Sequence, residues 1–201
     1  MTTPTLTYFD APVSRGEECR LAFAVAGVPF TDERLTREQF DARRDSFPYG
    51  ALPVLTIEGK GAIAQSNAIL RFIGSQHGLP ADPWESARHE AVLASVEEMR
   101  GRLGPTNRMK DPAEKQKART ELAKDYFPGW AASLERQITG PFFGGATLSV
   151  ADLKIYTALV PLLAGRIDHV PAEIFTGLPK LNALFAAVKA HPKVAAWYAK
   201  S

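Results

Sequence analysis

The sequence predicts a two-part fold, in which a small mixed α/β domain is followed by an all-helical domain. Over residues 1–77, strand-like and helix-like patterns alternate in the order βαβαββα, which is typical of a small mixed sheet covered by helices. The segment 78–83 contains a glycine and two prolines and has the composition of a linker. Over 84–201 only helical signals remain, so we expect an all-α second domain.

The first domain divides into short elements whose ends carry recognisable signals. Two helices are expected to begin with capping boxes, Ser14–Glu17 and Thr36–Gln39, in which each end of the box bonds a backbone N–H of the other. Ser66 is a typical N-cap residue and is expected to open a third helix. The expected strands, each apolar or alternating, are 6–9, 29–35, 54–57 and 62–64.

In the second domain, the helix starts carry a recurring chemical signal. Asp82 and Asp111 are each followed by a proline and then a glutamate, the order expected for an N-cap and a first helical turn. The segment 149–152, Ser-Val-Ala-Asp, is a variant capping box in front of a long apolar helix. Pro179 and Pro192 mark the starts of two further short helices.

The composition is that of a soluble globular protein, with 201 residues of which 45% are hydrophobic and 23% charged. A net charge of +2 without a basic run argues against nucleic acid or an anionic membrane as a partner. The most apolar segment, 155–163, is too short to span a bilayer. Cys19 is the only cysteine and the N-terminus lacks a signal-peptide pattern, so we expect a cytoplasmic protein. The four histidines show no ligand spacing, and no metal site is expected.

Two neighbouring segments predict a binding site for a small anionic peptide. Pro53 opens a short apolar strand, often in a tight and cis turn, and it forces Leu52 to be extended. The backbone N–H and C=O of Leu52 are then available to pair with another chain. The helix that begins near Gln65 and Ser66 offers unpaired N–H groups and a partial positive charge, which favour a carboxylate.

Two further residues are candidates for chemistry. Tyr8 lies at the C-terminal end of the first expected strand, where ligands of such sheets gather. Its phenol either packs in the core or donates a hydrogen bond to an anion. Arg15 lies in the first turn of a helix, where a cation opposes the helix dipole, and this favours a role outside the helix. Cys19 falls inside that helix and is expected to be structural.

These motifs together resemble the glutathione transferase family, and most closely its sigma class, which includes the glutathione-dependent prostaglandin D synthases. The resemblance implies a thioredoxin-like N-terminal domain with a cis peptide before Pro53, a helical C-terminal domain and a homodimer. The matching segments follow the family order over nearly the whole chain and are Tyr8–Phe9, Arg15–Glu17 with Arg20, Phe47–Pro53, Gln65–Arg71, Phe143–Gly145 and Leu148–Asp152.

The resemblance also implies how glutathione is held, as a co-substrate and without a bound cofactor. The cysteinyl backbone would pair with Leu52 beside the cis Pro53, and the γ-glutamyl carboxylate would meet Gln65 and Ser66. The glycyl carboxylate would face the residues that stand where related chains usually have Trp and Lys, which are Phe40 and Arg44.

An acidic residue of the second domain is expected to reach the glutathione amine bound to the neighbouring subunit. The resemblance assigns this to Glu98 of the partner subunit, with Glu97 as the alternative. The hydrophobic co-substrate is expected to rest on the helical domain, near Met99, Leu103, Met109 and Trp197.

The implied function is that of a glutathione transferase in detoxification, in which Tyr8 stabilises the glutathione thiolate and Arg15 supports the local field. The thiolate would then attack a hydrophobic electrophile. Two alternatives remain open at this point: a glutathione-dependent isomerase or peroxidase, and a non-catalytic ligand-binding or structural member such as the lens crystallins of the family.

Overall fold

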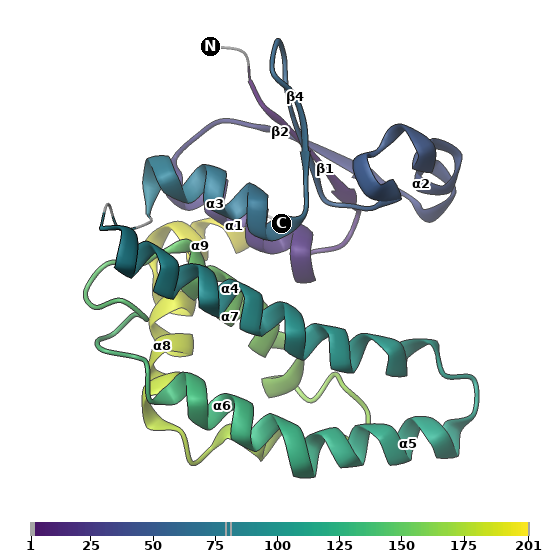
Figure 1. Ribbon diagram of the computed structural model, residues 1–201, viewed down its shortest axis with the longest axis vertical. Coiled ribbons are helices and arrows are strands. Elements are labelled where there is room, and N and C mark those ends of the chain that lie inside the picture. Colours follow the sequence, from purple (N-terminus) through teal and green to yellow (C-terminus); the bar gives the residue numbers. More distant parts are fainter. Residues whose placement is uncertain (1–2, 79, 81, 201) are drawn as a thin grey trace. The chain divides into compact units, whose positions relative to one another are not determined.

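The computed structural model describes residues 3–78, 80 and 82–200. The chain divides into two compact units, and each is considered by itself (Figure 1). One unit runs to Ser86 and also takes in the segment from Ala190 onward, while the other is Ala87–Lys189. The chain therefore returns at its C-terminal end to the unit in which it started.

The first unit is built on a four-stranded sheet with the strand order β2-β1-β3-β4. β1 (Thr5–Phe9) pairs in parallel with β2 (Thr31–Leu35), and the connection between them passes through α1 (Ser14–Ala26). β3 (Val54–Ile57) is antiparallel to β1 and to β4 (Gly61–Ala64). The predicted order of elements and the mixed sheet are confirmed.

Helices cover this sheet. α3 (Ser66–His77) packs beside α1, and α2 (Arg37–Arg43) lies on the other side of the strands (Figure 1). Two single 3₁₀ turns, Arg44–Ser46 and Pro48–Gly50, lead from α2 toward β3. α9 (Pro192–Tyr198), from the C-terminal segment, contacts α1 of the same unit.

The second unit is helical and begins inside α4 (Pro83–Leu103). The longest buried run is α7 (Val150–Leu163), whose apolar residues face neighbours on all sides. A one-turn π-helix over Leu122–Tyr126 joins α5 (Pro112–Glu121) to α6 (Phe127–Glu135). Two 3₁₀ segments also occur, Gly104–Arg108 and Ala172–Phe175. α8 (Pro179–Ala190) follows α7 along the chain.

Several predicted helix caps are confirmed. The Thr36 N–H donates to Gln39 Oε1 at 2.8 Å and the Gln39 N–H donates to Thr36 Oγ1 at 3.3 Å, a complete capping box. Asp82 and Asp111 each accept a backbone N–H from the first turn of α4 and α5, at 2.9 and 2.8 Å. These caps were predictable because both partners lie within three residues of each other.

The predicted capping box at Ser14–Glu17 is wrong. The N-cap of α1 is Val13, without a side-chain cap hydrogen bond in the described chain, and Ser14 has φ 58°. Glu17 is instead 1% exposed and bonded to Arg20 and Trp197. A buried carboxylate is stabilised more by a guanidinium and an indole N–H than by its own helix start, so the tertiary partners prevail.

The predicted N-cap at Ser66 is also wrong, by one residue. The N-cap of α3 is Gln65, with φ 73° and ψ 116°, and Ser66 is the first residue inside the helix. Gln65 is the single residue between β4 and α3, and the positive φ of Gln65 lies at this change from strand to helix. The helix N-terminus remains where the sequence predicts it.

Candidate functional site

The turn before β3 provides an extended backbone with unused hydrogen-bonding groups. The predicted cis peptide between Leu52 and Pro53 is present. The Leu52 side chain packs against a small apolar cluster, while its backbone N–H and C=O have no hydrogen-bond partner among the described residues. An extended peptide can therefore add to this position as a further strand.

The strand register brings three predicted site segments to one end of the sheet. β1 and β3 pair Thr7 with Val54, so the next residues in register are Tyr8 and Pro53. β3 and β4 pair Val54 with Ala64 at the end of their ladder, so Leu52–Pro53 and Gln65–Ser66 both lie just beyond that same end. Tyr8, Leu52–Pro53 and Gln65–Ser66 thus lie at the same end of the sheet.

The N-terminus of α3 carries the features of an anion site. The first N–H groups of a helix have no acceptor within the helix, and the helix dipole adds partial positive charge. The Gln65 side chain is exposed, and Ser66 is 3% exposed. The side-chain oxygen of Asn67 is buried without a hydrogen-bond partner among the described residues, a residue that sequence reasoning missed. Because an amide oxygen only accepts hydrogen bonds, this atom needs an N–H or O–H donor and would not be satisfied by an anion.

The Tyr8 ring lies against the first turn of α1. Tyr8 is 8% exposed, and a Cβ placed on Gly16 would lie 1.9 Å from Tyr8 Cδ1, closer than atoms can approach. Only glycine therefore leaves room for this ring position. Sequence reasoning missed this role of Gly16, and no local signal marks it, because the ring and the glycine meet only in the folded unit.

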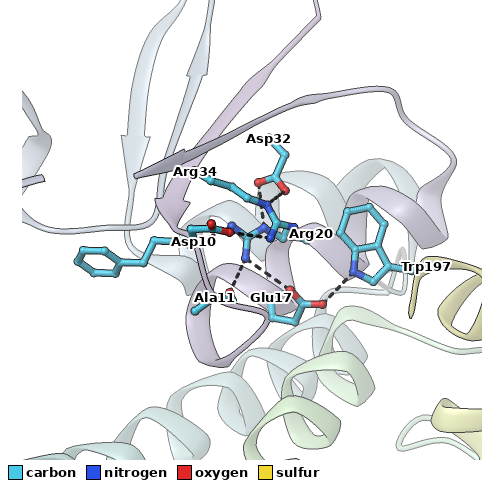
Figure 2. Close-up of polar contacts among 8 residues, drawn as sticks. Asp10, Ala11, Glu17, Arg20, Asp32, Arg34 and Trp197 are labelled. Carbon is cyan, nitrogen blue, oxygen red and sulfur yellow. Dashed lines mark hydrogen bonds and ion pairs between the residues drawn. The ribbon is translucent and has the colours of Figure 1, made fainter. Parts of the chain in front are cut away.

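The loop between β1 and α1 is held by a buried arginine, as Figure 2 shows. Arg20 is fully buried and donates to the backbone oxygens of Phe9 at 3.0 Å and Ala11 at 2.8 Å. Its Nε also donates to Asp32 Oδ1 at 2.9 Å. Arg15, the second residue of α1, is half-buried just beyond this loop. The sequence motif contained Arg20 but gave no sign of its acceptors.

A second ion-pair chain covers the outside of the same loop. Arg34 Nη1 lies 3.1 Å from Asp10 Oδ1, and Arg34 Nε lies 2.8 Å from Asp32 Oδ2. Asp32 thus accepts from both arginines. Partial burial opposes the charge of Arg34, but its hydrogen bonds to Asp10 and Asp32 prevail and raise its pKa. The loop that follows Tyr8 is therefore held by the buried Arg20 on one side and by the more exposed Arg34 on the other.

Phe40 is part of the core, and Arg44 lies over it. Phe40 is 4% exposed in a cluster with Leu35, Phe47, Val54 and Ala64. The Arg44 guanidinium carbon lies 4.6 Å from the Phe40 ring centroid, and Arg44 Nη2 lies 2.6 Å from Asp41 Oδ1. The Arg44 hydrogen bond is the main cause that lowers the pKa of Asp41. Phe40 is thus a platform for an exposed cation rather than a polar contact.

Glu97 and Glu98 have different environments. Glu97 Oε1 accepts from Lys154 Nζ at 2.6 Å and from Arg100 Nη1 at 3.1 Å, so it is fixed inside its own unit. The Glu98 side chain is 62% exposed and pairs at the surface with Arg102 at 3.0 Å. Of the two, Glu98 is the carboxylate presented to solvent.

The four predicted co-substrate residues do not all lie in one unit. Met99 is 1% exposed, Leu103 is half-buried and Met109 is 37% exposed, all in the second unit. Met109 lines an open hollow of about 530 Å³ with Arg102, Leu122 and Tyr126 among others. Trp197 belongs to the first unit, where its Nε1–H donates to Glu17 at 2.8 Å.

Membrane-spanning helices and metal-binding clusters are both missing from the described residues. No described helix combines the length and hydropathy needed to cross a membrane. No cluster of three or more His, Cys, Asp or Glu in the described ranges is arranged to hold a metal ion.

Comparison with family models matches both halves of the chain. The model for the glutathione S-transferase N-terminal domain matches residues 4–75, and that for the glutathione S-transferase C-terminal domain matches residues 97–201. Together with the four-stranded sheet and the helical second unit, these matches confirm the predicted thioredoxin-like fold class followed by a helical domain.

Individual relatives agree over nearly the full length. Glutathione S-transferase 1 of Ascaris suum is 31% identical over 97% of this chain and 95% of its own. S-crystallin 4 of Enteroctopus dofleini is 28% identical over 100% of this chain and 97% of its own. The structure of prostaglandin synthase D of Nilaparvata lugens superposes with a TM-score of 0.87 at 28% identity, covering 99% of this chain and 98% of that one. These findings confirm the prediction of a transferase, and the chain belongs to the glutathione S-transferase family.

Proposed function

We propose that this protein conjugates glutathione to small hydrophobic electrophiles, in the cytoplasm and as a homodimer, and so serves detoxification. The observation that carries the proposal is the strand register, which brings Tyr8, Leu52–Pro53 and Gln65–Ser66 to one end of the sheet. This end of the sheet then offers a hydrogen-bond donor in Tyr8, an extended backbone at Leu52 and an anion site at the start of α3.

Each part of glutathione has a matching group at this end of the sheet. The cysteinyl backbone pairs with the unused N–H and C=O of Leu52. The γ-glutamyl carboxylate binds the N-terminus of α3, with the exposed Gln65 side chain beside it. The glycyl carboxylate approaches the exposed Arg44 guanidinium, which can bind a carboxylate in a bidentate manner.

The chemical task is to generate a thiolate at neutral pH. A free thiol has a pKa of about 8.5, so only a few per cent is ionised at pH 7. A hydrogen bond to the charged form contributes about 1.5–3 kcal/mol, which lowers the thiol pKa by about one to two units. Tyr8 O–H is the donor and the Arg15 cation adds to the local field. The sulfur then forms a bond to the electrophilic carbon, the leaving group departs with its electron pair, and the thiol proton goes to solvent.

A second candidate function uses the same glutathione site. The likeness to a prostaglandin synthase D favours a glutathione-dependent isomerase, in which the thiolate attacks and is later released. The S-crystallin relative favours a non-catalytic member, but a structural protein has no need for a thiol partner at Tyr8. Product analysis with aryl halide, endoperoxide and hydroperoxide substrates separates transferase, isomerase and peroxidase activity.

The test of the proposal is Tyr8→Phe, which removes the phenol O–H and keeps the ring against Gly16. We expect kcat/KM for an aryl halide at neutral pH to fall about 10- to 100-fold, and the pH–rate profile to move up by about one to two units. The matched control is Tyr49→Phe, since Tyr49 is 81% exposed. Turnover by Tyr8→Phe equal to that of the parent across the neutral range would refute the assigned role.

The predicted partner contact has its own test. In the proposed homodimer, Glu98 of the partner subunit pairs with the glutathione amine, so Glu98→Gln should raise the KM for glutathione about 2- to 10-fold with little change in kcat. Sedimentation analysis of the parent protein checks the dimer itself. An unchanged KM in a protein that sediments as a dimer would exclude this contact.

A further inference from the structure

The C-terminal helix α9 is held within the first unit by three contacts, two to α1 and one to Phe30. The Trp197 Nε1–H donates to Glu17 Oε1 at 2.8 Å, and the indole stacks on Phe30 with ring centroids 6.1 Å apart. Lys193 Nζ donates to the Val25 carbonyl at 2.5 Å near the other end of α1. Figure 2 shows the indole pointing at the Glu17 carboxylate from the side opposite Arg20.

Glu17 lies between the C-terminal helix and the buried arginine. It is 1% exposed, and its second oxygen, Oε2, lies 3.5 Å from Arg20 Nη1. That distance is at the long limit of a hydrogen bond, whereas the contact to Trp197 is short. A buried carboxylate must find donors, so the indole N–H is what allows Glu17 to stay at this distance from Arg20.

The same Arg20 Nη1 donates to the Ala11 carbonyl at 2.8 Å, and Nη2 donates to the Phe9 carbonyl at 3.0 Å. These two carbonyls begin the loop directly after Tyr8. The Arg20 guanidinium carbon also lies 5.7 Å from the Tyr8 ring centroid. Glu17 and the loop carbonyls therefore compete for one guanidinium, and the outcome affects the residue that carries the phenol.

We propose that Trp197 is a positioning residue for Tyr8, acting through Glu17 and Arg20. The indole N–H occupies one oxygen of Glu17, which leaves the Arg20 guanidinium to hold the loop after Tyr8. Without that N–H, the Glu17 carboxylate closes on Arg20 and draws it from the Phe9 and Ala11 carbonyls. The phenol then loses its alignment with the thiol. This inference rests on the proposed function, since it assumes that Tyr8 serves the glutathione thiol.

This role differs from the predicted one, in which Trp197 lines the co-substrate pocket. A pocket residue changes the KM for particular electrophiles according to their size. A positioning residue changes the ionisation of bound glutathione, and so lowers kcat by the same factor for every electrophile. The two roles therefore have separable readouts.

The experiment compares Trp197→Phe with the parent protein. Phenylalanine keeps an aromatic ring for the stack on Phe30 and removes the N–H together with one ring of the indole. We expect the pKa of enzyme-bound glutathione, followed by thiolate absorbance, to rise by about half a unit to one unit. We expect kcat to fall about three- to tenfold for two aryl halides of different size, with their KM values unchanged. Trp84→Phe is the matched control, because Trp84 is 72% exposed in the same unit.

A rescue variant distinguishes positioning from simple loss of structure. Glu17→Gln combined with Trp197→Phe replaces the carboxylate by a neutral amide that attracts Arg20 weakly. The double variant should recover a lower thiol pKa and a higher kcat than Trp197→Phe alone. If Glu17 and Trp197 only stabilised the structure, the double variant should instead have a lower kcat than Trp197→Phe alone. Glu17→Gln alone keeps an acceptor for Trp197 and weakens the pull on Arg20, so it tests the same competition if Trp197→Phe folds poorly. A rise in the thiol pKa in this single variant would overturn the proposal.

The outcomes for Tyr8 and Trp197 separate the two proposals. If Tyr8→Phe raises the thiol pKa but Trp197→Phe leaves both that pKa and kcat unchanged, the positioning role of Trp197 is overturned and the proposed function stands. A change in KM for one electrophile only, or further loss in the double variant, also overturns it. If Tyr8→Phe itself leaves the thiol pKa unchanged, the proposed function fails first.

Discussion

Among single residues, Gly16 and Tyr8 form a pair in which the smaller residue decides where the larger one lies. The Tyr8 ring occupies the space in which any side chain at position 16 would begin. Cores are packed closely enough that such an overlap must displace one partner. The orientation of the phenol therefore depends on the absence of a side chain in the first turn of α1.

Gly16→Ala should consequently reduce both stability and activity. Its Cβ would lie 1.9 Å from Tyr8 Cδ1, so we expect a loss of about 1–3 kcal/mol in the free energy of unfolding. We also expect kcat/KM to fall by at least about tenfold, because a displacement of about 1 Å in a catalytic group can cost on the order of 100-fold. Urea denaturation and steady-state kinetics measure the two effects.

Gly101→Ala is the control for Gly16→Ala. Gly101 is an exposed position inside α4, and a methyl group added there would meet nothing within 4 Å, so alanine should stabilise the protein by about 0.5–1 kcal/mol. Activity should not change. A stabilised and fully active Gly16→Ala protein would show that the Tyr8 ring lies elsewhere in solution.

Gln65 illustrates backbone strain beside the proposed anion site. Its φ of 73° and ψ of 116° are unfavourable for a side chain, with a cost of about 1–3 kcal/mol. Gln65→Gly should therefore leave the free energy of unfolding unchanged or raise it by up to about 2 kcal/mol, while the KM for glutathione rises several-fold. Denaturation and glutathione titration test both parts.

The comparison for Gln65→Gly is Tyr49→Gly, at another positive φ of 57° and with the side chain 81% exposed. Tyr49 lies in the left-handed helical region, with ψ 17°, so relief of strain should be smaller there, and the KM for glutathione should stay the same. A clear loss of stability in Gln65→Gly together with an unchanged KM would mean that the side chain has a structural task instead.

What the sequence could predict at the residue scale follows from the range of the interactions. Leu52–Pro53 and Gln65 were predictable because proline chemistry and a helix start are local signals. The acceptors of Arg20 were not, because they lie 9 to 12 residues away and depend on the strand ladder. Gly16 was missed for the same reason.

Among the structural elements, the start of α7 is the most heavily buried cap. Asp152 is fully buried and accepts three hydrogen bonds, from the Phe143 N–H at 2.6 Å, the Ser149 N–H at 2.8 Å and the Ser149 hydroxyl at 2.7 Å. Burial is the main cause that raises the pKa of Asp152. The cap thus joins α7 to the segment before it.

Asp152→Ala should destabilise the second unit by about 3–5 kcal/mol. The change leaves two buried N–H groups without their acceptor, at about 1–3 kcal/mol each, and adds a cavity. Asp111→Ala, which removes the exposed cap of α5, should cost only about 1 kcal/mol. Urea denaturation of both variants tests the difference, and equal losses would show that burial of Asp152 does not matter to the cap.

Helix caps also show which features of an element cannot be predicted from its local sequence. Thr36–Gln39 and Ser14–Glu17 have the same local pattern, yet only the first forms a capping box. The difference is burial, since Gln39 is exposed whereas Glu17 is enclosed between Arg20 and Trp197. A pattern of four residues cannot report which of them will meet a distant partner.

At the scale of the whole molecule, the two-part organisation was predictable and the path of the C-terminus was not. The change from alternating to purely helical patterns predicted two parts. The segment from Ala190 nevertheless belongs to the first unit, although its short helix has the same start signal as α8. Its place in that unit depends on Trp197 and Phe30, which are far apart in the sequence.

The second residue of this returning segment is His191, whose pKa is lowered in the folded protein. His191 is the N-cap of α9, and its Nδ1 is buried without a hydrogen-bond partner in the described part of the chain. Burial, with the nearby Lys193 charge, lowers the pKa of His191 below its ordinary 6.5. The imidazole is therefore held neutral in the folded protein at pH values where the unfolded chain binds a proton.

The sign of the pH effect on stability follows from this proton count. Below about pH 6.5 the unfolded chain binds more protons at His191 than the folded one, so the free energy of unfolding falls as the pH falls through the lowered pKa. Above about pH 6.5 the contribution of His191 is complete. Asp152 acts in the opposite sense, because its raised pKa makes the folded protein bind more protons above about 3.8. A plot of the free energy of unfolding against pH for the unmodified protein therefore combines the effects of His191 and Asp152.

His191→Asn isolates the histidine, since an amide can cap a helix and does not titrate. The free energies of unfolding of parent and variant, measured in urea from about pH 5 to 8, should differ by a constant above about pH 7. Below about pH 6.5 the parent should lose stability relative to the variant, because only the parent takes up a proton at this position on unfolding. Parallel curves over the whole range would mean that His191 titrates normally in the folded protein. Added sodium chloride tests the Lys193 part, because screening weakens that repulsion and leaves the effect of burial in place.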